Sequence, residues 1–246
     1  MIGVLPNQEI EKLIKIGAIS SDVPIESEQI QPASLDMRLG SKAFRIRASF
    51  LPGNREKVEE RLKSLQMHEI DLRGGAVLEK GCVYLVPLLE VLKLPTDIQA
   101  AANAKSSTGR LDLLTRTISD SGEEFDRISS GYSGKLYAEI CPRSFSVLVR
   151  TGMKLNQIRF RNKNTTLNDE SLKALHAKEK LVPGNAIIDD GLGFSVDLQP
   201  SHGNLVGYRA KPHTGIIDLD LIDYYDPTEF WDEIRTSCGE IILDPG

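Results

Sequence analysis

The sequence is poor in the residues that build metal sites and disulfide frameworks. It has 3 cysteines and 4 histidines among 246 residues. Cys82, Cys141 and Cys238 are odd in number and far apart, which predicts no disulfide framework. No C-x-x-C occurs, and no H-x-E is paired with P-C-x-x-C, the combination that zinc-dependent nucleobase deaminases use. We therefore expect no zinc site, because the ligand spacing is missing.

Long apolar runs and an excess of positive charge are missing too. No segment approaches the roughly 20 apolar residues that span a bilayer, and the N-terminal MIGVLPNQEIEKL lacks the basic start and apolar stretch of a signal peptide. The formal net charge of -5 argues against a protein that coats nucleic acid or anionic membrane, but it leaves room for a local anion pocket. We expect a cytoplasmic protein whose partners include neither a nucleic-acid polymer nor a membrane.

Short segments of alternating polar and apolar residues dominate the first part of the chain. PASLDMRLG and AFRIRASF alternate in this way. Further short strands, separated by Gly or Pro, are expected over 69–72, 76–78, 83–87, 89–94 and 144–160. Many short strands at close spacing predict an all-β barrel or sandwich. Helices are expected after Asn7, over the charged insertion 54–66, and after Asn168.

Beyond residue 182 the chain resembles its own beginning. GFSVDLQ (193–199) is similar to ASLDMRL (33–39), and IILDPG (241–246) is similar to AVLEKG (76–81), in the same order. This pattern favours a tandem duplication. We predict a first domain over 1–182, followed over 183–246 by a linker and the incomplete start of a second, similar domain. Since about sixty residues of β structure cannot bury a core, we interpret the chain as a fragment of a longer protein or a truncated reading frame.

The segment KSSTGR places two hydroxyls and a guanidinium close together. Ser106 and Arg110 are four residues apart, so they would share one face of a helical turn. With Ser107 and the free N–H groups at the start of the turn, they could cradle a phosphate. The same pattern also fits an ordinary helix start with a surface arginine.

The segment GKLYAEI places one acid in an apolar strand. Leu136, Ala138 and Ile140 would face the core, and Tyr137 and Glu139 would face the other way. A carboxylate in such partly apolar surroundings can serve as a general base. The alternation fits equally well a solvated glutamate on an outer face.

Four segments together resemble a known family. QPASLDMRLG, SSTGRLDLL, RISSGYSGKLYAE and RTGMKLNQIRF are similar in sequence, order and spacing to the dCTP deaminases of the dUTPase-like superfamily. The resemblance covers roughly residues 7–160, and the restart near residue 193 is similar to the longer, tandem members. It implies a mainly β fold, a dUTPase-like β-barrel or distorted jelly-roll with a few short helices. It also implies a homo-oligomer, a trimer or pseudo-trimeric assembly, with sites between subunits or repeats.

The resemblance implies a hydrolase of nucleotide metabolism. The reaction would be zinc-independent deamination of dCTP to dUTP and ammonia, in pyrimidine deoxynucleotide biosynthesis. Glu139 stands at the position of the catalytic glutamate. Ser106, Ser107, Arg110 and Arg127 stand at positions that bind the substrate and its phosphates. Mg²⁺ would accompany the triphosphate rather than occupy a protein metal site.

The chain departs from the family pattern in three places. Ser129-Ser130-Gly131 replaces the usual Asp-Pro-Gly, which removes an acid near the site. The insertion SDSGEEFD separates Arg110 from Arg127, and no match to the lid over the triphosphate is found. Two alternatives therefore stay open: a dUTP or dCTP diphosphatase on the same fold, or a degenerate half that only binds nucleotide or supports an active copy.

Overall fold

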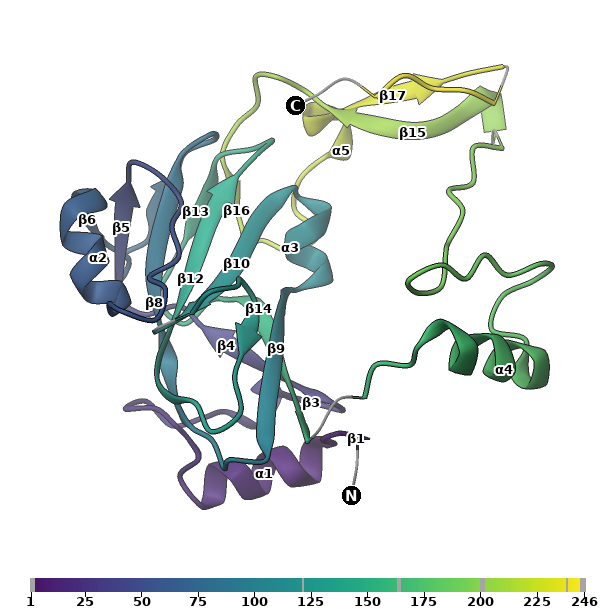
Figure 1. The fold of residues 1–246 in the computed structure, drawn as a ribbon. Helices are drawn as coiled ribbons and strands as arrows, with labels where there is room; N and C mark the ends of the chain where they lie inside the picture. Colours follow the sequence, from purple (N-terminus) through teal and green to yellow (C-terminus); the bar gives the residue numbers. More distant parts are fainter. Residues whose placement is uncertain (1–2, 121, 163–164, 200–201, 238, 244–246) are drawn as a thin grey trace. The chain divides into compact units, whose positions relative to one another are not determined.

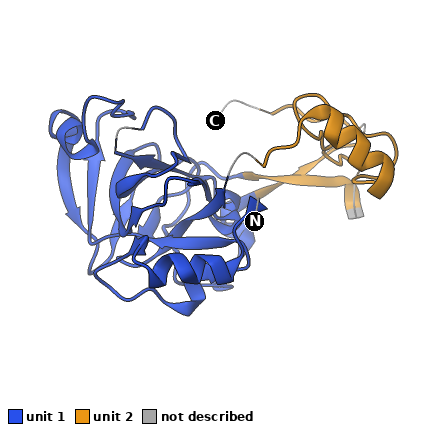
Figure 2. Ribbon diagram, turned by 60° about the horizontal axis from the view of Figure 1, so that its bottom comes forward, with its two compact units in different colours: residues 1–163, 210–231 blue, residues 164–209, 232–246 orange. Residues whose placement is uncertain are grey.

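The computed structural model describes residues 3–120, 122–162, 165–199, 202–237 and 239–243. It is mainly β with a few short helices, as the sequence predicts (Figure 1). The chain forms two compact units, one of residues 1–163 with 210–231, the other of residues 164–209 with 232–246 (Figure 2). None of the described helices is long and apolar enough to cross a membrane.

Three sheets build the first unit. The first contains β1 (Gly3–Val4), β3 (Ile30–Gln31), β4 (Ser34–Arg38), β9 (Ile98–Ala104), β11 (Arg127–Ile128) and β14 (Lys154–Asn162). The second contains β2 (Ile19–Ser20), β5 (Lys42–Ile46), β6 (Gln66–Asp71), β8 (Val83–Lys93), β10 (Leu113–Ser119) and β12 (Ser133–Pro142). The third contains β7 (Ala76–Leu78), β13 (Val147–Val149) and β16 (Ile217–Asp218).

Helices are short and lie outside the sheets. The first unit has α1 (Asn7–Lys15), α2 (Val58–Leu65), α3 (Ser106–Arg110), α5 (Pro227–Phe230) and a 3₁₀ turn over Ser27–Gln29. The second unit has α4 (Asp169–Glu179), a 3₁₀ turn over His202–Asn204, and most of the paired strands β15 (Leu205–Ala210) and β17 (Trp231–Arg235).

Two of the three predicted helix starts can be compared in detail. Asn168 caps α4 as predicted, because its side chain accepts a hydrogen bond from the Ser171 amide (2.9 Å). Asn7 does not cap α1. The cap position is Pro6, and Asn7 is already the first helical residue.

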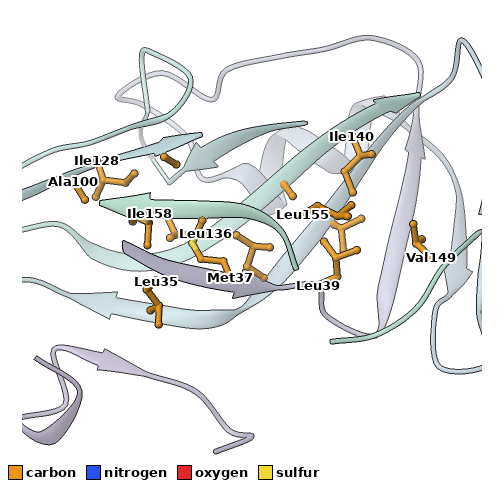
Figure 3. Packing of buried hydrophobic residues seen from close by; sticks show 14 of the residues in the cluster. Leu35, Met37, Leu39, Ala100, Ile128, Leu136, Ile140, Val149, Leu155 and Ile158 are labelled. Carbon is orange, nitrogen blue, oxygen red and sulfur yellow. The ribbon is translucent and has the colours of Figure 1, made fainter. Parts of the chain in front are cut away.

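The core lies between the two larger sheets. Figure 3 shows Leu35 and Met37 of β4 close to Ile158 of β14 and Leu136 of β12. Alternate residues of β12 point into this core, as predicted from the pattern of GKLYAEI. The main core is thus built from one face of each sheet.

The opposite face of β12 is also buried, which the sequence did not predict. Tyr137 belongs to a second apolar cluster with Leu85 of β8, Ile118 of β10, and Val58 and Leu62 of α2. Val58 and Leu62 are four residues apart, so they form one apolar stripe that lies on the sheet. The charged insertion 54–66 is therefore a cover for this face of the second sheet.

Pro87 lies inside one long strand instead of ending a short one. The segments predicted as 83–87 and 89–94 form the single strand β8, Val83–Lys93. The pairing of β8 with β12 shifts between Lys135 and Tyr137, and Tyr137 pairs with Pro87. A bulge at this point accommodates a residue that has no amide hydrogen to donate.

Residues 210–231 pack within the first unit although they follow α4 in sequence. β16 pairs in parallel with β13. Arg150 binds Asp218 through two hydrogen bonds of 2.6 and 2.8 Å, and Phe145 meets the Phe230 ring edge-on, with centroids 5.7 Å apart. These contacts attach the returning segment to the sheet.

The predicted division into 1–182 and 183–246 concerns a repeat in the sequence, and it stays a prediction. Residues 193–199, which resemble strand β4, form no strand in the structure. The other similar segment, 241–246, lies partly outside the described residues.

A buried ion pair fixes β4 against β8. The sequence pattern predicts a half-buried β4, but all five of its residues are buried. The Arg38 guanidinium donates from Nε to Oε1 of Glu90 (2.8 Å), and the Arg38 amide donates to Oε2 (2.8 Å). Gln29 donates to Glu90 Oε1 as well (2.9 Å). The side chains of Arg38 and Glu90 are 3% and 0% exposed, so each charge depends on the other.

We predict that Glu90→Gln lowers the free energy of unfolding by about 3–5 kcal/mol, because it leaves the Arg38 charge buried without a counter-charge. Urea denaturation measures the change. Arg73→Gln is the control, because Arg73 forms an exposed ion pair with Asp71 and its loss should leave the urea midpoint unchanged. Equal midpoints for Glu90→Gln and wild type would contradict the structural role of this pair.

Candidate active site

Glu139 lies in the middle of the second sheet. It is directly opposite Arg116 of β10 and Leu85 of β8 in the strand register. Its side chain is 2% exposed. A carboxylate this deeply buried requires a compensating cation or it takes up a proton.

Arg116 provides the cation. Its Nε and Nη2 donate to Glu139 Oε1 at 3.1 and 2.5 Å. The second oxygen, Oε2, is buried and has no hydrogen-bond partner among the described residues. Oε1 therefore accepts two hydrogen bonds from Arg116, while Oε2 accepts none from the described residues.

The guanidinium of Arg116 is itself held from two sides. Nη2 donates to the Ser49 hydroxyl (3.0 Å), and the guanidinium carbon lies 3.8 Å from the centroid of the Phe125 ring. The face of Phe125 attracts the cation electrostatically. Ser49 precedes α2, and Phe125 belongs to the SDSGEEFD insertion, so two separate loops reach the pair.

These two loops are joined by hydrogen bonds. The Gly53 amide donates to the Gly122 carbonyl (3.1 Å). The first amide of α2, at Val58, donates to Asp120 Oδ1 (3.0 Å). The loop before α2 and the insertion after β10 therefore form one connected cover next to Glu139.

Asp126 places a second acid beside the pair. Its Oδ1 accepts a hydrogen bond from the Thr117 amide (2.7 Å). Burial raises the pKa of Asp126, while the Thr117 amide and the Arg116 guanidinium oppose this rise and the Glu139 carboxylate adds to it. Asp126 lies three residues before Ser129, where the sequence resemblance leads us to expect an acid.

Helix α3 presents the predicted phosphate-binding residues to solvent. Ser106, Ser107 and Arg110 are exposed. The helix is anchored by Lys105, which forms an ion pair with the buried Asp36, and by the Thr108 hydroxyl, which donates to the Leu155 carbonyl (2.9 Å). An anchored turn with exposed hydroxyls and an exposed guanidinium can bind an anionic ligand.

Within one chain, the predicted catalytic residue and the predicted binding residues are not joined by the contacts that the structure describes. Among the described residues, no hydrogen bond or ion pair joins Glu139 to Ser106, Ser107, Arg110 or Arg127. Arg127 is exposed and pairs with Glu124 (2.6 Å). The role of each of these residues stays a prediction.

A cleft of about 700 Å³ lies beside α3. Ser107 and Thr108 line one part of it, and residues 150–155, 219–220 and 222 contribute to the rest. Its basic groups are already paired, Arg150 with Asp218 and Asp220, and Lys154 with Glu26 (3.4 Å). Glu139 does not line this cleft.

In the described part of the chain, no group of three or more His, Cys, Asp or Glu side chains is placed to hold a metal ion.

Arg116, Ser49 and Phe125 were not predicted from the sequence. A signal for Arg116 exists in LLTRTIS, where it is the one charged residue of a strand that pairs with GKLYAEI. Ser49 has no comparable signal, because it lies 67 residues away from Arg116 in a loop.

Fold and site together define a mainly β protein that holds a buried carboxylate suited to acid–base chemistry. Residues 1–164 match the family described as the 2′-deoxycytidine 5′-triphosphate deaminase N-terminal domain, and residues 168–246 match the C-terminal domain of the same description. The first match covers more than half of the chain. The chain belongs to the dCTP deaminase family.

Relatives agree with this assignment. A crystal structure of 2′-deoxycytidine 5′-triphosphate deaminase from Agrobacterium tumefaciens is 47% identical, has a TM-score of 0.92, and is matched over 99% of this chain and 74% of that one. A dUMP-forming dCTP deaminase of Beutenbergia cavernae is 28% identical over 64% of this chain and 78% of its own length. A dCTP deaminase of Haemophilus influenzae is 32% identical over 55% of this chain and 70% of its own. The fold expected from the sequence resemblance is confirmed.

We predict that Asp126→Asn becomes more stable relative to wild type as the pH rises. The folded-state pKa of Asp126 is raised, so its favourable contribution is present below the unfolded pKa and is lost as the pH rises through the folded one. Asparagine does not titrate, tolerates the left-handed backbone (φ 61°), and can still accept the Thr117 amide.

Thermal unfolding between about pH 4 and pH 8 measures this trend, since the range begins at the ordinary Asp pKa. The exposed Asp97→Asn is the control and should show no trend. A midpoint difference between Asp126→Asn and wild type that stays constant or falls with pH would refute the prediction.

Proposed function

We propose that Glu139 is the general base with which this chain deaminates dCTP. The observation that carries the proposal is the buried carboxylate whose Oε1 is held by Arg116 and whose Oε2 has no described partner. A general base needs a lone pair within reach of the water that it activates. Oε2 meets this requirement, and Oε1 does not.

The reaction consumes one water and releases one ammonia. Oε2 takes a proton from the water, whose oxygen adds to C4 of the cytosine ring. The proton then passes from Glu139 to the amino group at C4, the C–N bond breaks, and dUTP and ammonia leave. Exclusion of bulk water strengthens the electrostatic interactions that stabilise the charge developing on the ring.

Ser106, Ser107, Arg110 and Arg127 are the proposed binding residues for dCTP and its triphosphate. Their exposure supports this role, because exposed hydroxyls and guanidinium groups suit phosphate oxygens. Mg²⁺ would bind between the phosphate oxygens of the substrate and screen their charge.

We also propose that the complete site forms between copies of the chain. Glu139 has no described bond to the α3 residues, so a second subunit is the proposed source of the missing half. A trimer, or a pseudo-trimeric assembly in which the predicted domains 1–182 and 183–246 act as repeats, would satisfy this. The scaffolding alternative differs by predicting no turnover by assemblies of this chain alone, and turnover only when an active copy is present.

A second candidate product is dUMP. Relatives carry both the plain and the dUMP-forming name, and the dUMP-forming reaction adds hydrolysis at phosphorus. Asp126 supplies the additional acid that a diphosphatase step would need to orient water. We propose dUTP as the main product, and nucleotide chromatography separates dUTP from dUMP with pyrophosphate.

We predict that Glu139→Gln lowers the rate of ammonia release from dCTP at least about 100-fold, because the amide cannot accept the proton from water. A coupled ammonia assay with dCTP and Mg²⁺ measures the rate. Glu11→Gln, at an exposed position of α1, is the control and should keep the wild-type rate. An unchanged rate in Glu139→Gln would remove the role of general base from this residue.

We predict that Arg110→Gln raises the KM for dCTP about 10- to 100-fold, since a charge-assisted bond to phosphate is lost. The kcat should change much less, because a group that binds phosphate takes no part in the proton transfer at the base. Steady-state kinetics separates the two constants, with the exposed Arg73→Gln as the control. A selective loss of kcat would disprove a phosphate-binding role.

A further inference from the structure

The carboxylate of Glu139 can act as a base only while it is ionised. It lies on the sheet face that Tyr137, α2 and the two joined loops cover, and it is 2% exposed. Among the described residues, Arg116 is its ion-pair partner. If this cation were absent, the buried carboxyl group would take up a proton and lose its function as a base.

The ion pair between Arg116 and Glu139 involves only one of the two carboxylate oxygens. Two donors of one guanidinium converge on Oε1, at 3.1 and 2.5 Å, and leave Oε2 free. Two charge-assisted hydrogen bonds to the same oxygen hold Oε1 against the guanidinium and so turn Oε2 away from it. The free oxygen is therefore presented in one orientation.

Arginine suits this position better than lysine. It stays charged at every physiological pH, so it cannot compete with Glu139 in proton transfer. Its flat guanidinium also lies against the Phe125 ring at 3.8 Å while Nη2 reaches Ser49 at 3.0 Å. A lysine ammonium would keep the charge but not this combination of contacts.

We propose that Arg116 is a positioning residue for the deamination reaction, held by Ser49 and Phe125 so that it keeps Glu139 ionised and turned with Oε2 toward the water. The assignment rests on the proposed function of Glu139. It also explains a role of the SDSGEEFD insertion, which places the Phe125 ring next to the guanidinium of Arg116.

Titratable and charged groups lie near Glu139 on three of the described elements. Arg116 faces it from β10, and Asp126 from the loop after β10. In β12 itself, Tyr137 and Cys141 lie two residues before and after Glu139, and burial raises the pKa of both side chains. These neighbouring groups are present in every variant at position 116, so a difference in pH profile between the variants comes from the change at Arg116.

The test compares wild type with Arg116→Gln and Arg116→Lys, measuring kcat, KM and the pH profile of kcat for ammonia release from dCTP. We expect Arg116→Gln to lower kcat about 10- to 100-fold, with KM within about twofold of wild type. The acidic limb of its kcat profile should move to higher pH, because the loss of the cation favours the protonated carboxyl group.

Lysine at position 116 retains the positive charge, so Arg116→Lys should keep the acidic limb near that of wild type. It should still lower kcat, because the fork and the stacking on Phe125 are lost. Arg73→Gln removes an exposed arginine elsewhere and should match wild type in every constant. Circular dichroism checks that each variant is folded.

A second variant covers the case in which Arg116→Gln does not fold. Phe125→Leu keeps the charge pair and removes only the ring, and it should lower kcat about threefold or more with little change in KM, the scale of one cation–π contact. If folded Arg116→Gln kept the wild-type kcat and pH profile, or changed KM alone, the assignment would be overturned. A wild-type kcat in Phe125→Leu would overturn it as well.

A failure of the proposed dCTP deamination would give a different experimental result. In that case wild type itself releases no ammonia from dCTP, and both proposals are overturned. Where wild type is active and Glu139→Gln is not, the behaviour of Arg116→Gln decides the positioning role alone.

Discussion

The ion pair between Arg116 and Glu139 is the interaction on which the candidate site depends. A carboxylate in the middle of a sheet, covered on its own face, is costly unless a cation accompanies it. Arg116 lies directly opposite on the neighbouring strand, so the strand register itself delivers the charge. The loops that carry Ser49 and Phe125 then hold the guanidinium in place.

Strand β12 serves two purposes at once because its side chains alternate. Leu136 and Ile140 join the main core between the sheets (Figure 3), while Tyr137 and Glu139 point to the face that α2 covers. The core fixes the strand, and the strand thereby fixes the acid on its other face. The buried pair of Arg38 and Glu90 provides similar rigidity between β4 and β8, away from the site.

Local sequence patterns predicted single segments of the site, but the contacts between these segments depend on how distant strands pair. The alternation of GKLYAEI was enough to place Glu139 opposite the core, and KSSTGR was enough to predict the helical turn α3. The partner Arg116 could not be found in this way, because a cross-strand pair depends on register between distant segments. The cover was missed for a related reason: a charged insertion such as 54–66 indicates a surface helix, but not the face on which its few apolar residues lie.

Water attack at C4 of the cytosine ring distinguishes deamination from the alternatives on this fold. The most direct measurement is turnover of dCTP by the wild-type protein in H₂¹⁸O, with mass spectrometry of the nucleotide products. Activation of water by Glu139 for attack at C4 predicts one ¹⁸O atom in the uracil base of the product, whether dUTP or dUMP is formed. An intact, unlabelled cytosine base with ¹⁸O only in the phosphates would contradict it.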